Sequence, residues 1–245
     1  MNMSVILNYT TASSDLPSFL ADWQDNFGYR GDGSFNQVRN TTDQWFAGTP
    51  GNATASSVIV NGDDYSLTPG TVDGTVDTLA LGSNLTYSGS ADTWSQTVGL
   101  SVDLDGAPLT DAWDAAITDL SQNGSLDGLY AYFAEQGTVQ NGTVGDDVLL
   151  SFGGDDVFYG GDGADTFLFT GNDGADTIKD FDADADVIDV SAWGADAFTS
   201  LSVSWINQGV QDVYNAVITY NGNGNTITVE NIAFGSLDAG NVLVA

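Results

Sequence analysis

Apolar residues recur at helical spacing near the start of the chain. They fall at i, i+3, i+4, i+7 and i+11, which places them on one face of a helix: Leu16, Phe19, Leu20, Trp23 and Phe27. Ser13 or Ser14 can cap this helix, and Pro17 is tolerated because it falls in the first turn. The pattern predicts one amphipathic helix of about 14 residues.

Between residues 56 and 105 the period of the apolar positions changes to two. Alternating runs such as SSVIV and TVGLSVDL predict an antiparallel meander with one buried face. Asn61-Gly62 stands between two such runs and predicts a hairpin turn. The last run carries four apolar residues of one parity, which we expect in the core: Val98, Leu100, Val102 and Leu104.

Two more helical patterns follow, within residues 111–120 and 126–136. Thr110 and Ser125 stand at the N-cap positions, and Gly137 stands where a helix usually ends. Together with the first helix and the meander, they predict an α+β domain over residues 1–140, with helices packed on one antiparallel sheet.

The composition changes after residue 140. Of the 34 acidic residues, 13 lie between residues 141 and 190, and all 13 are aspartates. Further on, the runs SLSVSWI, AVITY and TITVENIAF are strand-like, and NGNGN at 221–225 predicts a hairpin turn between the last two. We therefore expect a second, all-β domain over residues 141–245.

The charge balance is strongly acidic. Only Arg30, Arg39 and Lys179 face 34 acidic residues, which gives a formal net charge of −31. Such a chain repels nucleic-acid phosphates and anionic lipid surfaces, so we expect neither as a partner. It also repels itself when compact, and bound cations are therefore expected as part of the folded structure.

The residue types that the chain lacks restrict its chemistry. There is no cysteine and no histidine, which excludes disulfides, thiolate metal sites, serine triads and the usual zinc sites. Neither HExxH nor GxSxG occurs, so we expect no enzyme, with paired-carboxylate chemistry as a remote alternative. The first 20 residues lack a signal-peptide pattern, and no run of about 18 apolar residues predicts a membrane span.

Four nonapeptides stand in near-register between residues 142 and 179. They read GTVGDDVLL, SFGGDDVFY, GGDGADTFL and, after Phe169-Thr170, GNDGADTIK. Position four is always glycine: Gly145, Gly154, Gly163 and Gly174. Position six is always aspartate: Asp147, Asp156, Asp165 and Asp176. Position eight is always apolar: Leu149, Phe158, Phe167 and Ile178.

These residue types at this spacing suit calcium. Calcium takes six to eight oxygen ligands, which the position-six carboxylates and the carbonyls of glycine loops, including those of Gly154 and Gly163, can supply between turns. The position-eight side chains should point into a roll of short strands. Without the ion the aspartates repel one another, so we expect folding to require calcium. A solvated acidic linker is the alternative, which four repeats in near-register disfavour.

The third nonapeptide matches G-G-x-G-x-D-x-U-x in full, the pattern of RTX proteins, and IKDFDADADVIDVSAWG resembles the segment after the repeats in the serralysin C-terminal domain. The resemblance covers about residues 141–245 and implies a parallel β-roll. It implies Asp180 and Asp186 as further calcium ligands. It also implies an extracellular protein exported by type I secretion machinery, with which the apolar ending NVLVA is compatible.

Four segments of the first domain resemble HasA-type haem-acquisition proteins, the secreted hemophores: SVILNY, LPSFLADWQDNFG, LGSNLTYSGSADTWSQTVGLSVDLDG and NGSLDGLYAYFAEQGT. In that family the tyrosine of the NLTY segment binds ferric haem iron, which corresponds to Tyr87. The chain departs from the family because Ser95 stands where a histidine accompanies this tyrosine. The second histidine ligand is also missing, so Gln37 or water would replace it. Trp94 and Phe35 would then flank the porphyrin, and core packing is the alternative for each.

Two hypotheses follow from these patterns and resemblances. The first is a secreted, non-enzymatic calcium-binding protein whose first domain binds ferric haem through Tyr87 and meets a cell-surface haem receptor. The second is a calcium-stabilised extracellular binding or structural module that has lost haem, as the missing histidines suggest.

Overall fold

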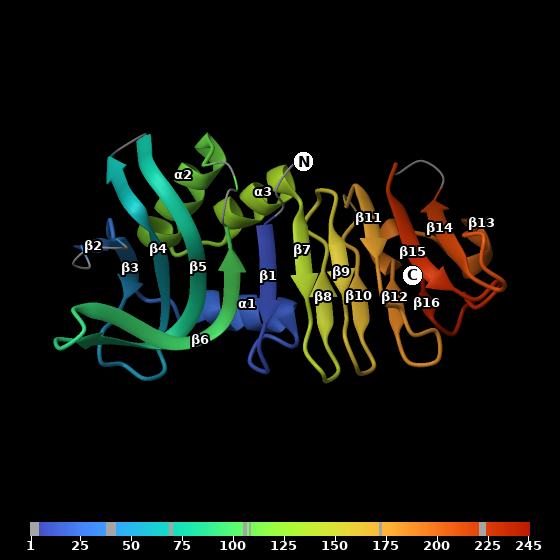
Figure 1. Cartoon of the computed structure of the whole chain (residues 1–245), viewed down its shortest axis with the longest axis horizontal. Coiled ribbons are helices and arrows are strands. Elements are labelled where there is room, and N and C mark those ends of the chain that lie inside the picture. Colours follow the sequence, from blue (N-terminus) through green and yellow to red (C-terminus); the bar gives the residue numbers. More distant parts are fainter. Residues whose placement is uncertain are drawn as a thin grey trace. The chain divides into compact units, whose positions relative to one another are not determined.

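The computed structural model describes residues 5–37, 43–68, 71–104, 107, 109–171, 173–220 and 224–245. Contacts group the chain into two compact units, whose elements are labelled in Figure 1. The first consists of Met1–Ser13 and Ser18–Gln136, and the second consists of Ser14–Pro17 and Gly137–Ala245. The assignment of residues 1–140 and 141–245 to separate folding domains stays a prediction.

The first unit combines long antiparallel strands with short helices. Its elements are β1 (Val5–Tyr9), α1 (Leu16–Asp25), β2 (Ser34–Gln37), β3 (Asp43–Gly48), β4 (Ser56–Thr68), β5 (Thr71–Ser88), β6 (Thr93–Asp103), α2 (Asp111–Thr118), a π-helical turn (Asp119–Asn123) and α3 (Asp127–Gln136). The strands pair in the order β1-β6-β5-β4-β3-β2, and each pair is antiparallel.

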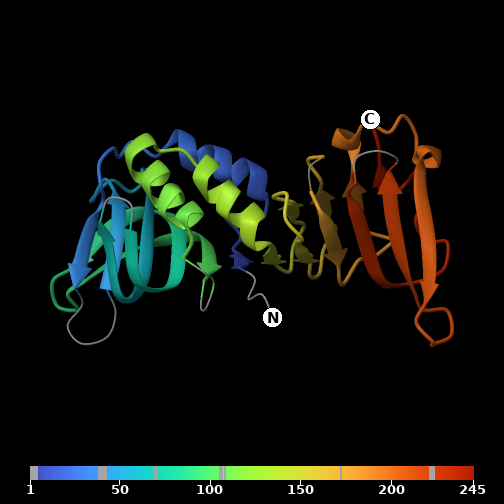
Figure 2. The ribbon, with the colours of Figure 1, turned by 90° about the horizontal axis from the view of Figure 1, so that it is seen from above.

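Large apolar side chains fill the interior of the first unit. Leu20 and Trp23 of α1 are buried, as is Trp113 of α2. The Trp23 indole N–H lies 3.1 Å from the carbonyl oxygens of Ser57 and Gly82, so its polar atom is satisfied within an apolar environment. Figure 2 shows α2 and α3 side by side. Between them, Trp113 of α2 meets Tyr132 of α3 edge-on, with the ring centroids 5.2 Å apart.

The predicted first domain, with helices packed on one antiparallel sheet, is wrong. The strands belong to a twelve-stranded mixed sheet, and the three α-helices in the described residues are only 8 to 10 residues long. Alternation shows which face of a strand is buried but not which strand pairs with its edge, so it cannot reveal a larger mixed sheet. No helix in the described part of the chain is both long and apolar enough to span a membrane.

Two local predictions within the meander are also wrong, and β-bulges explain both. Asn61-Gly62 lies inside β4, at a register shift against β5, and does not form the hairpin turn. Val98 is 41% exposed, whereas the other three residues of its run are buried. Leu100 pairs with Leu81 while Val98 pairs with Gly82, so the extra residue Gly99 reverses the alternation.

The second unit alternates short strands between two layers. Its strands are β7 (Thr138–Asn141), β8 (Val148–Leu150), β9 (Val157–Tyr159), β10 (Thr166–Leu168), β11 (Ala175–Ile178), β12 (Val187–Asp189), β13 (Leu201–Asn207), β14 (Tyr214–Tyr220), β15 (Thr226–Ile232) and β16 (Val242–Leu243). One layer runs β7-β9-β11-β15, and the other runs β8-β10-β12-β16, all parallel. The unit is not wholly parallel, because β14 and β13 continue the first layer antiparallel.

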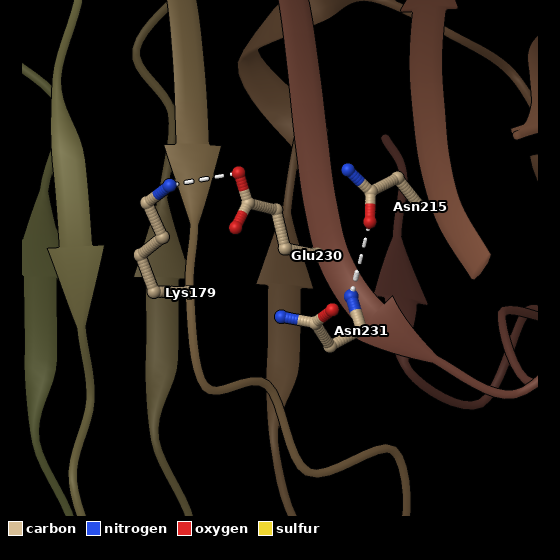
Figure 3. A network of polar contacts seen from close by, with 4 residues as sticks. All are labelled: Lys179, Asn215, Glu230 and Asn231. Atoms are coloured by element: carbon tan, nitrogen blue, oxygen red, sulfur yellow. Dashed lines mark hydrogen bonds and ion pairs between the residues drawn. The ribbon is translucent and has the colours of Figure 1, made fainter. Parts of the chain in front are cut away.

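A narrow apolar core lies between these layers. The four position-eight side chains are fully buried, as predicted, and Phe158 meets Phe167 edge-on at 6.0 Å. Directly after β11, Lys179 Nζ lies 2.7 Å from Oε1 of Glu230 in β15, an ion pair drawn in Figure 3. The predicted NGNGN turn falls largely on residues 221–223, outside the described residues.

Candidate functional site

The position-six aspartates are buried in two rows. Asp147 and Asp165 directly precede β8 and β10, whereas Asp156 directly precedes β9 and Asp176 lies in β11. Each is only 1% exposed, which is rare for a carboxylate without a partner of opposite charge. Asp186 precedes β12 in the same way and is 3% exposed. The structure therefore groups the predicted ligands by row rather than by sequence neighbourhood.

Hydrogen bonds connect each row from turn to turn. The Asp147 N–H donates to Asp165 Oδ1 and the Asp165 N–H donates to Asp186 Oδ1, each at 2.9 Å. In the other row, the Asp156 N–H donates to Asp176 Oδ1 at 2.8 Å. Asp165, Asp176 and Asp186 thus each use one carboxylate oxygen to hold the backbone of the preceding turn. The other oxygen of each carboxylate is left for a different partner.

Three of the remaining carboxylate oxygens have no hydrogen-bond partner. They are Asp147 Oδ1, Asp165 Oδ2 and Asp176 Oδ2, all shielded from solvent. A buried, unpaired carboxylate oxygen is expensive unless a cation or a proton neutralises it. Hard oxygen donors of this kind are the ligands that calcium prefers, so these residues fit that ion.

Burial raises the pKa of several of these carboxyls. Desolvation, followed by repulsion from neighbouring carboxylates, brings the pKa of Asp165 to about 6 and that of Asp176 to about 9. Burial also raises the pKa of Asp156 and of Asp186 above the ordinary value. Without a cation, the folded loops therefore disfavour the ionised form on which metal binding depends.

Glycines let the loops of successive turns stack closely. Gly163 has φ +133°, and a Cβ on it would lie 2.6 Å from the Gly145 carbonyl oxygen. A Cβ on Gly174 would lie 2.7 Å from the carbonyl oxygen of Gly154. Only glycine fits such contacts, which bring backbone carbonyls of one turn against the next. The predicted residues Gly154 and Gly163 both lie in these stacked loops.

Asp180 holds the backbone of a repeat loop. Its two carboxylate oxygens accept the N–H groups of Gly160 and Gly161, at 2.9 and 3.1 Å. Its charge also raises the pKa of Asp165 and of Asp186, so the three carboxyls lie within electrostatic reach. Among the described residues no three acidic side chains converge on one point, so an ion there would also need carbonyl ligands. The predicted ligand set stays a prediction.

Neutral residues end both rows, and the repeat pattern did not indicate them. Thr138 precedes the repeats and donates its N–H and Oγ1–H to Asp156 Oδ1, at 2.7 and 2.6 Å. At the start of the other row, Ser14 accepts the Val148 N–H through its carbonyl at 2.6 Å. Beyond Asp186, the next strand of this layer is β16, which Asn241 directly precedes. The rows are therefore finite.

Position-five and position-three aspartates were also missed. Asp146 Oδ1 accepts the Ala164 N–H and Asp155 Oδ1 accepts the Ala175 N–H, each at 2.9 Å. The signal was present in the sequence, since GDD in the first two repeats becomes GAD in the next two. Asp173 is fully buried but differs, because protein donors satisfy both of its oxygens.

Tyr87 lies on the surface of the first unit. It is 50% exposed, and its O–H donates to Asp92 Oδ1 at 2.5 Å. Its ring centroid lies 5.2 Å from that of Trp94, the residue opposite it on β6, and Trp94 stacks on Phe46 at 4.3 Å. A carboxylate five residues onward thus takes the place expected for a histidine acceptor.

The other residues predicted around the haem are placed differently. Ser95 lies within 3.2 Å of Thr86, hydroxyl to hydroxyl, and not beside the Tyr87 phenol. Phe35 of β2 is 42% exposed, while the side chain of Gln37 falls outside the described residues. Trp94 is a predicted flanking ring that the structure brings against Tyr87.

Solved structures that partly resemble this chain include the following two. One is the apo hemophore HasA from Yersinia pestis, with a TM-score of 0.42 and 22% identity over 54% of this chain and 89% of that one. The other is the R3 subunit of the mannuronan C5-epimerase AlgE6 from Azotobacter vinelandii, with a TM-score of 0.31 and 23% identity over 44% and 77%. No family model and no curated protein matches the sequence.

Proposed function

We propose that the second unit binds calcium between successive turns of its repeats and folds when it does so. The observation that supports this most directly is the set of three buried carboxylate oxygens without partners, on Asp147, Asp165 and Asp176. A bound divalent cation supplies the positive charge that these oxygens lack.

Calcium would be held by neighbouring aspartates within a row. Asp147 with Asp165, and Asp165 with Asp186, would share ions in one row, and Asp156 with Asp176 would share one in the other. Loop carbonyls, including those of Gly154 and Gly163, would complete the oxygen shell. Asp180 would add a further carboxylate near Asp165. The residues themselves orient the site, because each carboxylate is already fixed by a backbone N–H.

Calorimetric titration of the EDTA-treated chain with calcium tests this proposal, together with circular dichroism before and after the titration. We expect saturable binding, a gain of β-structure and a higher melting temperature. Magnesium is the matched control ion, because it demands octahedral geometry and keeps its water. Identical spectra and melting curves in EDTA and in calcium would refute calcium-coupled folding.

A second candidate function is ferric haem binding by the first unit through Tyr87. The observation that favours it is the half-exposed phenol, hydrogen-bonded to Asp92 and placed beside the Trp94 ring. A phenolate is a hard anionic ligand that suits ferric iron, and an indole beside it offers an apolar surface to a porphyrin. The chain has no histidine, so Tyr87 would be the ligand from this face.

Hemin titration followed by visible spectroscopy tests the second candidate. We expect a shifted Soret band with the unaltered protein and with Tyr159→Phe, which removes another exposed tyrosine, in the second unit. Tyr87→Phe should abolish the shift. The same spectrum for Tyr87→Phe and the unaltered chain contradicts ligation by Tyr87. No shift in any of the proteins favours a calcium-stabilised binding or structural module without haem.

We further propose that the protein is not an enzyme and works outside the cell after type I export, where it would meet a haem receptor at a cell surface. Calcium-coupled folding supports this location, since a chain that calcium stabilises is more easily kept unfolded for export where calcium is scarce. Antibody detection in cell-free medium, in producing cells with and without the type I exporter, tests it. Detection only inside the cells contradicts it.

A further inference from the structure

Three aromatic rings form a cluster at the surface of the second unit, on β13, on β14 and just after β15. The centroid of Phe234 lies 5.2 Å from that of Trp205 and 5.4 Å from that of Tyr214. Trp205 and Tyr214 lie 6.4 Å apart, edge to face. Phe234 is 66% exposed, and neither of the others is buried. This aromatic cluster leaves large apolar side chains in water, which commonly marks a binding surface.

The backbone beside the aromatic cluster departs from a regular strand. Tyr214 pairs with Ile232 but Ala216 pairs with Val229, so two residues of β15 oppose Asn215. One of them, Asn231, has φ +59°, a left-handed conformation that few side chains tolerate. Asn215 Oδ1 accepts the Asn231 N–H at 3.2 Å, as Figure 3 shows.

The bulge at Asn231 changes the direction of the side chains that follow it. A β-bulge re-aims the strand beyond it, and such bulges concentrate beside functional sites. Here the redirected strand leads within three residues to Phe234, the most exposed ring of the aromatic cluster. The bulged backbone and the exposed rings are therefore two separate observations at one place.

The segment that carries Trp205 and Tyr214 is nearly uncharged. Between Ala197 and Val229 the only charged residue is Asp212, in a chain with 34 acidic residues. Amides take the place of charges, since Asn207 pairs with Tyr214 across the hairpin and Asn215 lies at the bulge. An anionic ligand is repelled by a net charge of −31. For a cationic ligand, the carboxylates nearest in sequence to the rings are Asp212 and Glu230, and Glu230 is already paired with Lys179.

We propose that the aromatic cluster binds a neutral saccharide chain. A sugar ring has an apolar C–H face that can lie on an aromatic ring, and hydroxyl groups that exchange hydrogen bonds with amides. The three rings provide the stacking surface, and Asn207, which pairs with Tyr214 on the same face, provides an amide beside them. This binding depends on neither haem nor Tyr87, so it is independent of the second candidate function.

Affinity electrophoresis tests the proposal, with the full calcium-treated chain run in gels that contain dextran, laminarin or galactomannan. We expect at least one of these neutral polysaccharides to retard the chain. Phe234→Ala and Trp205→Ala should weaken the retardation about ten-fold, because truncation removes a stacking ring. Ile206→Ala is the matched control, since Ile206 is 53% exposed on the same strand as Trp205 but on its opposite face.

Each alternative result has a defined meaning. If Trp205→Ala does not fold, Phe234→Ala alone tests whether the aromatic cluster binds the polysaccharide. Its fold should be retained, because a side chain that is 66% exposed contributes little to the core. The proposal is wrong if no neutral polysaccharide retards the chain, if Phe234→Ala is retarded as strongly as the unaltered protein, or if anionic alginate retards it equally. Dimerisation that is lost in Phe234→Ala also overturns it, because the surface would then pair two copies of the chain.

Discussion

Buried aspartates of this protein differ in chemistry according to their hydrogen-bond donors. Asp173 is fully buried and receives the Thr170 and Gly171 N–H groups and the Trp193 indole N–H. Asp165 and Asp176 are equally inaccessible, yet each keeps one oxygen without a donor. Asp173 therefore has a structural role, whereas the other two are suited to bind a cation.

Asp165→Asn should have opposite effects with and without calcium. The asparagine amide still has an oxygen that can accept the Asp147 N–H. Its NH2 group replaces the unpaired Oδ2, and the substitution removes a buried negative charge. In EDTA we expect the variant to be more stable than the unaltered chain, by about 1–3 kcal/mol. In calcium we expect about ten-fold weaker binding or more. Thermal melting with and without calcium measures both effects.

Asp212→Asn is the control for this substitution, because it makes the same chemical change at an exposed hairpin position. It should alter neither calcium affinity nor stability by more than about 0.5 kcal/mol. If Asp165→Asn destabilised the metal-free chain, the assignment of Asp165 Oδ2 to a cation would lose its physical basis.

At the scale of elements, stacked glycine loops alternate with strands of three or four residues. Such strands bury little area, so the loops must stabilise the second unit as much as its core does. The close approach of Gly163 to Gly145 shows how tightly the loops are packed. Changes in the loops should therefore affect the whole second unit.

Gly163→Ala should destabilise the calcium-bound second unit by about 2 kcal/mol or more. The new Cβ would meet the Gly145 carbonyl oxygen at 2.6 Å in a backbone conformation with φ +133°. Gly209→Ala is the control, because Gly209 also has positive φ but no atom within 4 Å of a new Cβ. Gly209→Ala should lower the free energy of unfolding by about 1 kcal/mol. Equal losses in the two variants, measured by calcium-dependent melting, contradict close packing of the loops.

The metal-free second unit should lose stability as the pH rises. The folded pKa of Asp165 is about 6 and that of Asp176 about 9, both above the unfolded value of 3.8. The contribution of these two carboxyls to the free energy of unfolding is therefore fully present below about pH 4. It is lost as the pH rises through 6 and then 9. Melting in EDTA between pH 5 and 9 measures this. Stability that increases over this range would contradict the raised pKa values.

At the scale of the whole molecule, the net charge of −31 opposes compaction. Three basic residues cannot offset it, and the ion pair between Lys179 and Glu230 uses one of them. Part of the repulsion acts through solvent between exposed carboxylates, and part acts among the buried aspartates of the two rows. Dissolved salt screens the first part effectively but not the second.

Sodium chloride should therefore replace calcium only in part. Raising the concentration from 0.1 to 1 M shortens the screening length from about 10 to about 3 Å, which should stabilise the metal-free chain. We expect the melting temperature to stay below that in 10 mM calcium chloride, a concentration of about ten times or more the Kd typical of extracellular calcium sites. Equal melting temperatures would indicate screening alone, without specific calcium sites.

The sequence by itself determined the features that depend on neighbouring residues and composition. The repeat register, the aspartates at position six and the buried side chains at position eight all follow from a nine-residue period. The helical stripe around Leu20 and Trp23 follows from its spacing. Excess acidity, and with it the need for cations, follows from the residue counts.

Only the tertiary structure decided the features that join distant residues. Alternation could not show that the strands form a mixed twelve-stranded sheet, or that a bulge turns Val98 to the solvent. No local pattern paired Tyr87 with Asp92 or placed Thr138 and Ser14 at the starts of the aspartate rows. The physical reason is that periodicity specifies which face of an element is buried, whereas its partners depend on how the whole chain packs.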